Sequence, residues 1–144
     1  MSKAVRAVDV ALAVLGTVLT WLPIAATLGL SAIGTIADRT LRFDVLMPAE
    51  LFPVYLSGAV LLAIAAVRTR RWRRWLLVTP LVAIAALAGT QGLAILTGLA
   101  DGSHPPSGWR LVLVLSLLAL YVVALIVNGI VGWRLARALR RDAA

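Results

Sequence analysis

The chain has 144 residues, of which 62% are hydrophobic and 14% are charged, with a formal net charge of +8 and no cysteine. Soluble domains are about half apolar and about a quarter charged, and a chain of this size cannot hide such an excess of apolar surface. The composition therefore excludes an ordinary water-soluble domain. The lack of cysteine excludes disulfides, thiolate metal ligands and cysteine nucleophiles.

Four long apolar stretches follow one another along the chain. A helix needs about 20 predominantly apolar residues to cross roughly 30 Å of hydrocarbon. Uncharged runs of this length lack the alternating polar face of a membrane barrel strand, and only a helix satisfies its own backbone hydrogen bonds. We therefore predict one all-α transmembrane domain over residues 1–144, an integral membrane four-helix bundle. Its spans are expected at about residues 10–36, 48–67, 75–99 and 110–133.

The first span could instead be a secretory signal peptide, because Lys3 and Arg6 precede its apolar run. That run continues to Ala37, far beyond the apolar region of a signal peptide, so we expect a retained helix. Pro23 falls in the middle of this span and removes an internal hydrogen bond, which predicts a kink there.

Basic side chains gather in three segments: the N-terminal tail, the turn between the second and third spans, and the C-terminal tail. With four spans these segments share one side of the membrane, and the positive-inside rule makes that side the cytoplasm. Both termini are therefore expected to be cytoplasmic. The turn interleaves arginine with Trp72 and Trp75, but at a membrane face we expect contact with anionic lipid headgroups rather than nucleic acid. The arginines in question are Arg68, Arg70, Arg71, Arg73 and Arg74.

The third span is rich in small residues, and the pairs Ala85/Gly89 and Ala88/Gly92 form a smooth groove at four-residue spacing. Lipid gives helices no hydrophobic reason to associate, so close packing of small residues must supply the attraction. We therefore expect the third helix at the centre of the bundle.

The fourth span divides into two parts. Its first part, residues 111–115, alternates Leu and Val and is expected to face lipid. Further along, Ala124, Asn128 and Gly132 recur every four residues and form a small or polar stripe. We expect this stripe to face protein.

The uncharged polar residues of the spans fall into two layers by depth. At 1.5 Å of rise per residue, Gln91 lies roughly 5 Å outward of its span's midpoint and Asn128 roughly 9 Å toward the cytoplasm, about 14 Å apart. Hydrogen bonds between membrane helices contribute about 1 kcal/mol each, so we expect a structural role, with Thr27 pairing to Gln91. A substrate-binding role is the alternative. The outer layer contains Thr27, Tyr55, Ser57 and Gln91, and the inner layer contains Thr17 and Asn128.

No group of residues points to a catalytic, metal or cofactor site. The single histidine, His104, has one nearby aspartate, which is too few ligands for a closed metal site. No charge is predicted deep in a span, where ion-coupled transporters keep one. Asp9 is expected at a helix end, where it can pair with Arg6 three residues before it. A membrane enzyme would have to draw on residues of the external side: Asp38, Asp44, Glu50 and His104.

The sequence therefore favours a non-enzymatic membrane protein that acts by helix–helix association, either as an accessory or assembly subunit of a membrane complex or as a homo-oligomer. The expected partners are membrane lipids and another membrane protein or a second copy, with no nucleic acid and no cofactor. The Ala/Leu/Val/Arg-rich, cysteine-free composition is typical of a bacterial inner-membrane protein. The alternative is a transporter or channel-type protein for an apolar or weakly polar solute. Its pathway would be lined by Thr17, Thr27, Tyr55, Gln91 and Asn128.

Overall fold

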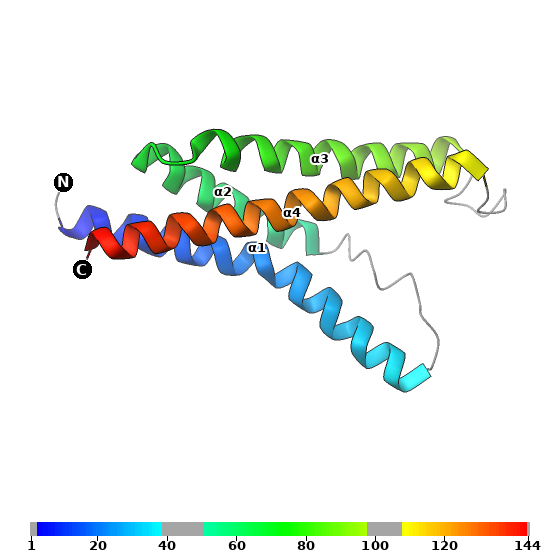
Figure 1. The fold of residues 1–144 in the computed structure, drawn as a ribbon, viewed down its shortest axis with the longest axis horizontal. Helices are drawn as coiled ribbons and strands as arrows, with labels where there is room; N and C mark the ends of the chain where they lie inside the picture. The colour runs from blue at the N-terminus through cyan, green and yellow to red at the C-terminus, as the bar shows by residue number, and fades with distance from the viewer. Residues whose placement is uncertain (1–2, 39–50, 98–107, 144) are drawn as a thin grey trace.

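The computed structural model describes residues 3–38, 51–97 and 108–143, and these residues form four helices (Figure 1). All four helices are long and apolar enough to cross a membrane. The all-α prediction is confirmed for the described residues. The helices are α1 (Lys3–Asp38), α2 (Phe52–Thr69), α3 (Arg73–Leu96) and α4 (Gly108–Ala143).

The helices differ from the predicted spans at their ends. Helix α1 begins at Lys3, before the first apolar span, and α4 continues through its arginine-rich tail to Ala143. Alanine and arginine are strong helix formers, so the helix continues where the apolar run stops. Residues 48–50 and 98–99 of the predicted spans lie outside the described residues.

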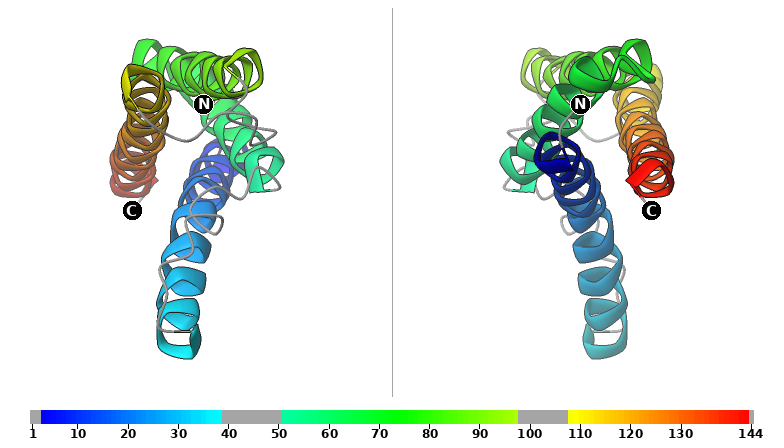
Figure 2. Two further views of the ribbon diagram at one scale, coloured as in Figure 1. Left: turned by 90° about the vertical axis from the view of Figure 1, so that its right-hand side faces the viewer. Right: turned by 90° about the vertical axis from the view of Figure 1, so that its left-hand side faces the viewer.

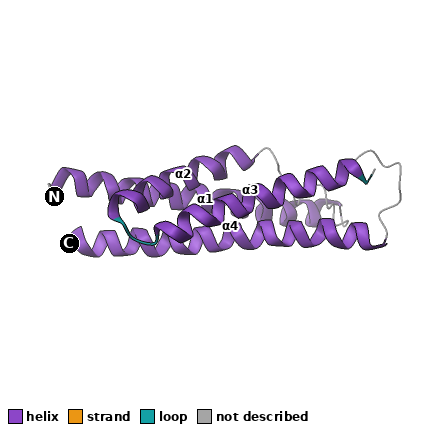
Figure 3. Cartoon of the chain, turned by 90° about the horizontal axis from the view of Figure 1, so that it is seen from above, coloured by secondary structure: helices purple, strands orange, loops and turns teal. Residues whose placement is uncertain are grey.

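Helix α1 packs most extensively on α2, α3 packs on α4, and α1 also packs along α4. The start of α1, the α2–α3 turn and the end of α4 lie at the same end of the molecule (Figures 1 and 3). We call this the termini end and define it by residues 3–9, 68–74 and 134–143. Three basic segments that are distant in sequence therefore meet in space.

Two glycines set the crossing of α1 and α2. A Cβ added to Gly58 would lie 2.8 Å from both the carbonyl oxygen of Gly16 and the backbone nitrogen of Thr20. A Cβ added to Gly16 would lie 2.9 Å from the Gly58 oxygen. Backbone atoms cannot yield as a flexible side chain can, so this crossing requires glycine on both helices. Small residues at such crossings are what allow membrane helices to approach closely.

Leu62 fills the space between α1, α2 and α4 and is fully buried. Its side chain lies against two glycines, since a Cβ on Gly132 would meet Leu62 Cδ1 at 2.7 Å and a Cβ on Gly16 would meet Leu62 Cγ at 2.9 Å. Ala124, Asn128 and Gly132 are all buried, so the prediction that this stripe of α4 faces protein is confirmed.

The prediction that the third helix forms the centre of the bundle is wrong. Ala85 and Ala88 are exposed, and a Cβ added to Gly92 would meet nothing within 4 Å. Of the two glycines in the predicted pairs, only Gly89 has a neighbour within 4 Å of its added Cβ, Leu117 of α4 at 3.4 Å. The centre is instead taken by Leu62 and by the glycine crossing of α1 and α2, because that pair permits the closer approach.

Helix α1 bends away from the other three helices in its second half (Figures 1 and 2). That half follows Pro23, which lies inside the helix. Proline has no N–H for the preceding turn and its ring crowds that turn, so this course agrees with the predicted kink. Only the first half of α1 therefore belongs to the packed bundle.

Candidate binding groove between helices α1 and α4

The structure does not bring the predicted outer polar layer together. Tyr55 is fully buried with no partner for its hydroxyl in the described part of the chain, whereas Ser57 and Gln91 are exposed. The hydroxyls of Thr27 and Ser57 donate within their own helices, to the carbonyls of Pro23 and Pro53, both at 2.8 Å. The expected Thr27–Gln91 pair is therefore absent from the described residues. Beyond Pro23, α1 diverges from the bundle and carries Thr27 with it.

Among the described residues, the inner layer contains one hydrogen bond between helices. The hydroxyl of Thr79 on α3 lies 2.7 Å from the Trp75 carbonyl and 3.0 Å from Oδ1 of the fully buried Asn128 on α4. A hydroxyl has one proton and cannot donate to both oxygens. Turning the Asn128 amide lets Nδ2, which otherwise has no partner, donate to the Thr79 oxygen while Thr79 donates to Trp75. Thr17 is buried in the same layer and donates to the Ala13 carbonyl at 2.7 Å.

Asp9 lies within α1 and is buried, instead of lying at the end of the helix as predicted. Its expected pairing with Arg6 is wrong. The aspartate is 2% exposed, and its Oδ1 accepts a hydrogen bond from Nε of Arg68 on α2 at 2.5 Å. Arg6 instead donates from Nη1 to the main-chain oxygen of Asp142, at 2.7 Å. Because α1 begins at Lys3, Asp9 lies inside the helix on the side that faces α2. Sequence spacing alone gives the nearest partner along the chain, not the nearest in space.

The five arginines predicted to bind lipid headgroups divide into two groups. Arg68 pairs with Asp9, and Nη1 of Arg71 lies 2.9 Å from Oδ2 of Asp142. The other three, Arg70, Arg73 and Arg74, are exposed and form no ion pair with the described residues. Headgroup binding stays a prediction for all five.

An open groove of about 700 Å³ lies between α1 and α4. Its lining is almost entirely apolar. A second hollow of about 260 Å³ shares Thr17, Val18 and Trp133 with it and extends it toward the termini end. We call the two together the α1/α4 groove. Its lining residues are Val14, Thr17, Val18, Trp21, Leu22 and Ala25 on α1, and Ile130, Trp133, Ala136, Arg137 and Arg140 on α4.

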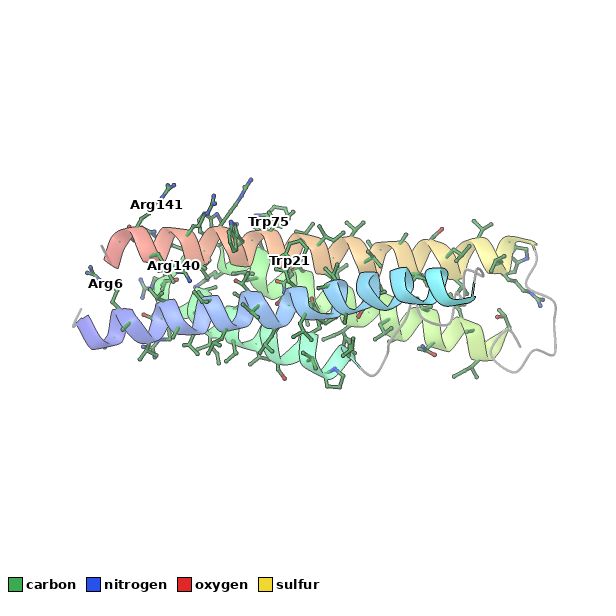
Figure 4. The ribbon with its side chains drawn as sticks, turned by 90° about the horizontal axis from the view of Figure 1, so that it is seen from below. Arg6, Trp21, Trp75, Arg140 and Arg141 are labelled. Carbon is green, nitrogen blue, oxygen red and sulfur yellow. The ribbon has the colours of Figure 1, made fainter. Side chains whose placement is uncertain are left out.

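One tryptophan and one glycine set the shape of this groove. A Cβ added to Gly129 of α4 would lie 2.8 Å from Cε2 of Trp21, so the indole packs directly on the α4 backbone. The space beside that contact stays open, because Ala25 is too small to fill it and α1 then bends away. Figure 4 shows Trp21 between the two helices.

The two arginines at the termini end of the groove carry no counter-charge from the described residues. Arg137 lies over the ring of Trp133, 5.2 Å from its centroid. Arg140 lies between α4 and α1, whereas Arg141 points away on the other side of α4 (Figure 4). The two described carboxylates at this end, Asp9 and Asp142, pair with other arginines. The groove is therefore apolar along its length and positive at one end.

The lining side chains of the α1/α4 groove include no carboxylate, imidazole or thiol. The only hydroxyl among its lining side chains belongs to Thr17 and is used within α1. Within residues 3–38, 51–97 and 108–143 no three His, Cys, Asp or Glu side chains lie close enough to hold a metal ion. Asp44, Glu50 and His104, and the side chain of Asp38, lie outside the described residues. No protein-family model, curated protein or solved structure matches the chain.

Proposed function

We propose that this chain is a multi-pass protein of a bacterial inner (cytoplasmic) membrane, with both termini and the α2–α3 turn in the cytoplasm. Four helices of sufficient length and hydropathy support the membrane location. The orientation rests on the arginines gathered at the termini end, whereas Arg110 lies at the other end of α4. Basic residues near helix ends are retained on the cytoplasmic side.

We further propose that the protein is not an enzyme and acts by helix–helix association, with α3 as the associating helix. The carrying observation is that the small-residue face of α3 is not used inside the chain. Ala85 and Ala88 are exposed, and the space beside Gly92 is open. The partner is a transmembrane helix of another membrane protein or of a second copy.

The exposed face of α3 has the form that close packing between membrane helices requires. Leu81, Ala85, Ala88, Gly92 and Ile95 follow one another at spacings of three and four residues, so they lie on one side of the helix. Leu81 is 64% exposed and Ile95 is 66% exposed, and they stand on either side of the small residues. A smooth groove between two larger side chains lets a second backbone approach closely and gains van der Waals contact. The opposite side of α3, with Leu76, Ala83 and Thr90, is buried in the bundle.

The test is native mass spectrometry of the full chain after mild extraction from its source membrane. We expect a second protein, or a second copy, at fixed stoichiometry. Ala88→Leu places a large side chain on the exposed face without touching the bundle, so it should reduce the complex severalfold. Ala119→Leu is the matched control, because Ala119 is an exposed alanine on α4. It should leave the complex intact.

Two outcomes would overturn the proposal. A monomer in the native spectrum, with no second protein, would contradict association. Equal complex formation by Ala88→Leu and wild type would contradict the assignment to α3. A monomer that retains one reproducible small molecule other than a phospholipid would favour the alternative, a transporter for an apolar or weakly polar solute.

A further inference from the structure

We propose that the α1/α4 groove is a binding site for one anionic phospholipid of the cytoplasmic leaflet. An acyl chain occupies the apolar length of the groove, and the phosphate lies at Arg137 and Arg140. This inference rests on the proposed membrane orientation but not on the proposed role of α3.

The length of the groove matches one leaflet. Its lining on α1 runs from Val14 to Ala25, which at 1.5 Å of rise per residue corresponds to about 16 Å, and Ala25 lies close to the middle of the predicted span 10–36. Half of a hydrocarbon core of roughly 30 Å has the same depth. A lipid whose headgroup lies at the termini end therefore finds an apolar wall on α1 for its chain down to the middle of the membrane, and α4 lines the part nearest the headgroup.

The width and lining of the groove suit an acyl chain. The main hollow holds about 700 Å³, within the range of roughly 300 to 1,000 Å³ typical of small-molecule sites. Val18, Leu22 and Ile130 are 55%, 42% and 43% exposed, so they present apolar surface without covering one another. The side of the groove is open, which lets a lipid enter from the bilayer.

The charge at the mouth selects an anionic headgroup. Arg137 and Arg140 have no carboxylate partner among the described residues, because Asp9 and Asp142 are paired with Arg68 and Arg71. Guanidinium groups bind phosphate oxygens through paired hydrogen bonds, and Trp133 holds Arg137 at the groove by its cation–π contact. A partner helix would have to cover both arginines or bring acids to them, whereas an anionic phospholipid meets the apolar wall and the charges together.

The experiment is native mass spectrometry of the full chain released from nanodiscs that contain phosphatidylcholine and phosphatidylglycerol at a ratio of three to one. The expected result is one retained phosphatidylglycerol in preference to phosphatidylcholine. The double variant Arg137→Ala/Arg140→Ala should lower that retention by about tenfold or more, because each arginine attracts the anionic headgroup independently. The variant Arg134→Ala/Arg141→Ala removes the same charge from residues that do not line the groove, and should retain the lipid.

A third variant tests the acyl chain separately from the charge. Ala25→Phe places a ring in the hollow, where Ala25 is exposed, so it does not disturb the core. It should reduce lipid retention although every arginine remains. Circular dichroism of each variant in the nanodisc confirms that the helices are intact.

The outcomes separate this inference from the proposals on which it stands. Failure of the chain to enter nanodiscs would contradict the membrane location itself. Oligomers in the same spectra test the proposed role of α3 independently. Equal retention by the two double variants would reduce the effect to a general basic surface and overturn the site. A lipid-free dimer that Ala25→Phe abolishes would assign the groove to a helix of a second copy and also overturn it.

Discussion

Asp9 and Arg68 stand 59 positions apart in sequence and form a contact of 2.5 Å between Oδ1 and Nε that joins α1 to α2. The two sides of this pair differ in exposure. The aspartate is 2% exposed and the arginine 45%, so the carboxylate depends on its partner far more than the guanidinium does. The pair holds α2 against the first turns of α1, on the side of the glycine crossing that faces the termini end.

The asymmetry predicts unequal costs for breaking the pair. Arg68→Gln leaves a buried carboxylate without a counter-charge and should lower the free energy of unfolding by about 3 kcal/mol. Asp9→Asn leaves an arginine that still reaches solvent or headgroups, and should cost about 1 kcal/mol. Unfolding by SDS in mixed micelles measures both. The double variant should cost less than the two single changes added together. A larger loss from Asp9→Asn than from Arg68→Gln would contradict the burial of the carboxylate.

The crossing of α1 and α2 should not tolerate a methyl group. Gly58→Ala places a Cβ 2.8 Å from the Gly16 oxygen and from the Thr20 nitrogen, so the helices must move apart. The expected loss is about 1 to 3 kcal/mol of unfolding free energy, the cost of overpacking. Gly29→Ala on α1 is the matched control, because nothing lies within 4 Å of its added Cβ. It should be neutral or slightly stabilising, since alanine favours helix. Equal behaviour of the two variants would mean that the helices do not cross at Gly58.

The contact between Thr79 and Asn128 should be the polar link between α3 and α4. Thr79→Val keeps the shape of the side chain but removes the one hydroxyl that, among the described residues, hydrogen-bonds the buried Asn128 amide. It should cost about 1 kcal/mol. Asn128→Leu removes the amide itself, so Thr79→Val should cost little in that background. A double-mutant cycle measures this coupling, and additive effects of the two changes would show that no such bond forms.

The proposed orientation predicts which single cysteines a membrane-impermeant maleimide can reach. The chain has no native cysteine, so each introduced thiol reports on one position. In right-side-out vesicles Arg110→Cys should be labelled, whereas Arg70→Cys and Arg141→Cys should be labelled only after the membrane is opened. The reverse pattern would place the termini end outside and would remove the basis for headgroup binding in the cytoplasmic leaflet.

The sequence identifies the polar residues of the bundle more readily than their partners. Asn128 is recognisable as a residue that must face protein, but its neighbour Thr79 is not, because a threonine next to Pro80 resembles an ordinary helix start. Asp9 is predicted at a helix end because its apolar run begins after it. Only the position of α2 in the structure shows that Arg68 faces Asp9. The sequence does hold one signal for this ion pair: an aspartate near the end of one helix and a row of arginines near the end of another, both predicted on the same side of the membrane.

Length and hydropathy by themselves determined that this chain forms four helices able to cross a membrane, because each apolar run must satisfy its own backbone hydrogen bonds. They also determined that the basic segments meet at one end. The tertiary structure decided which faces are buried: Gly16 and Gly58 inside, the small face of α3 outside, and a groove between α1 and α4. The physical reason is that lipid and protein interior are about equally apolar, so hydropathy does not distinguish the lipid-facing side of a membrane helix from its buried side. The stripe of Ala124, Asn128 and Gly132 on α4 is the exception, because Asn128 is polar.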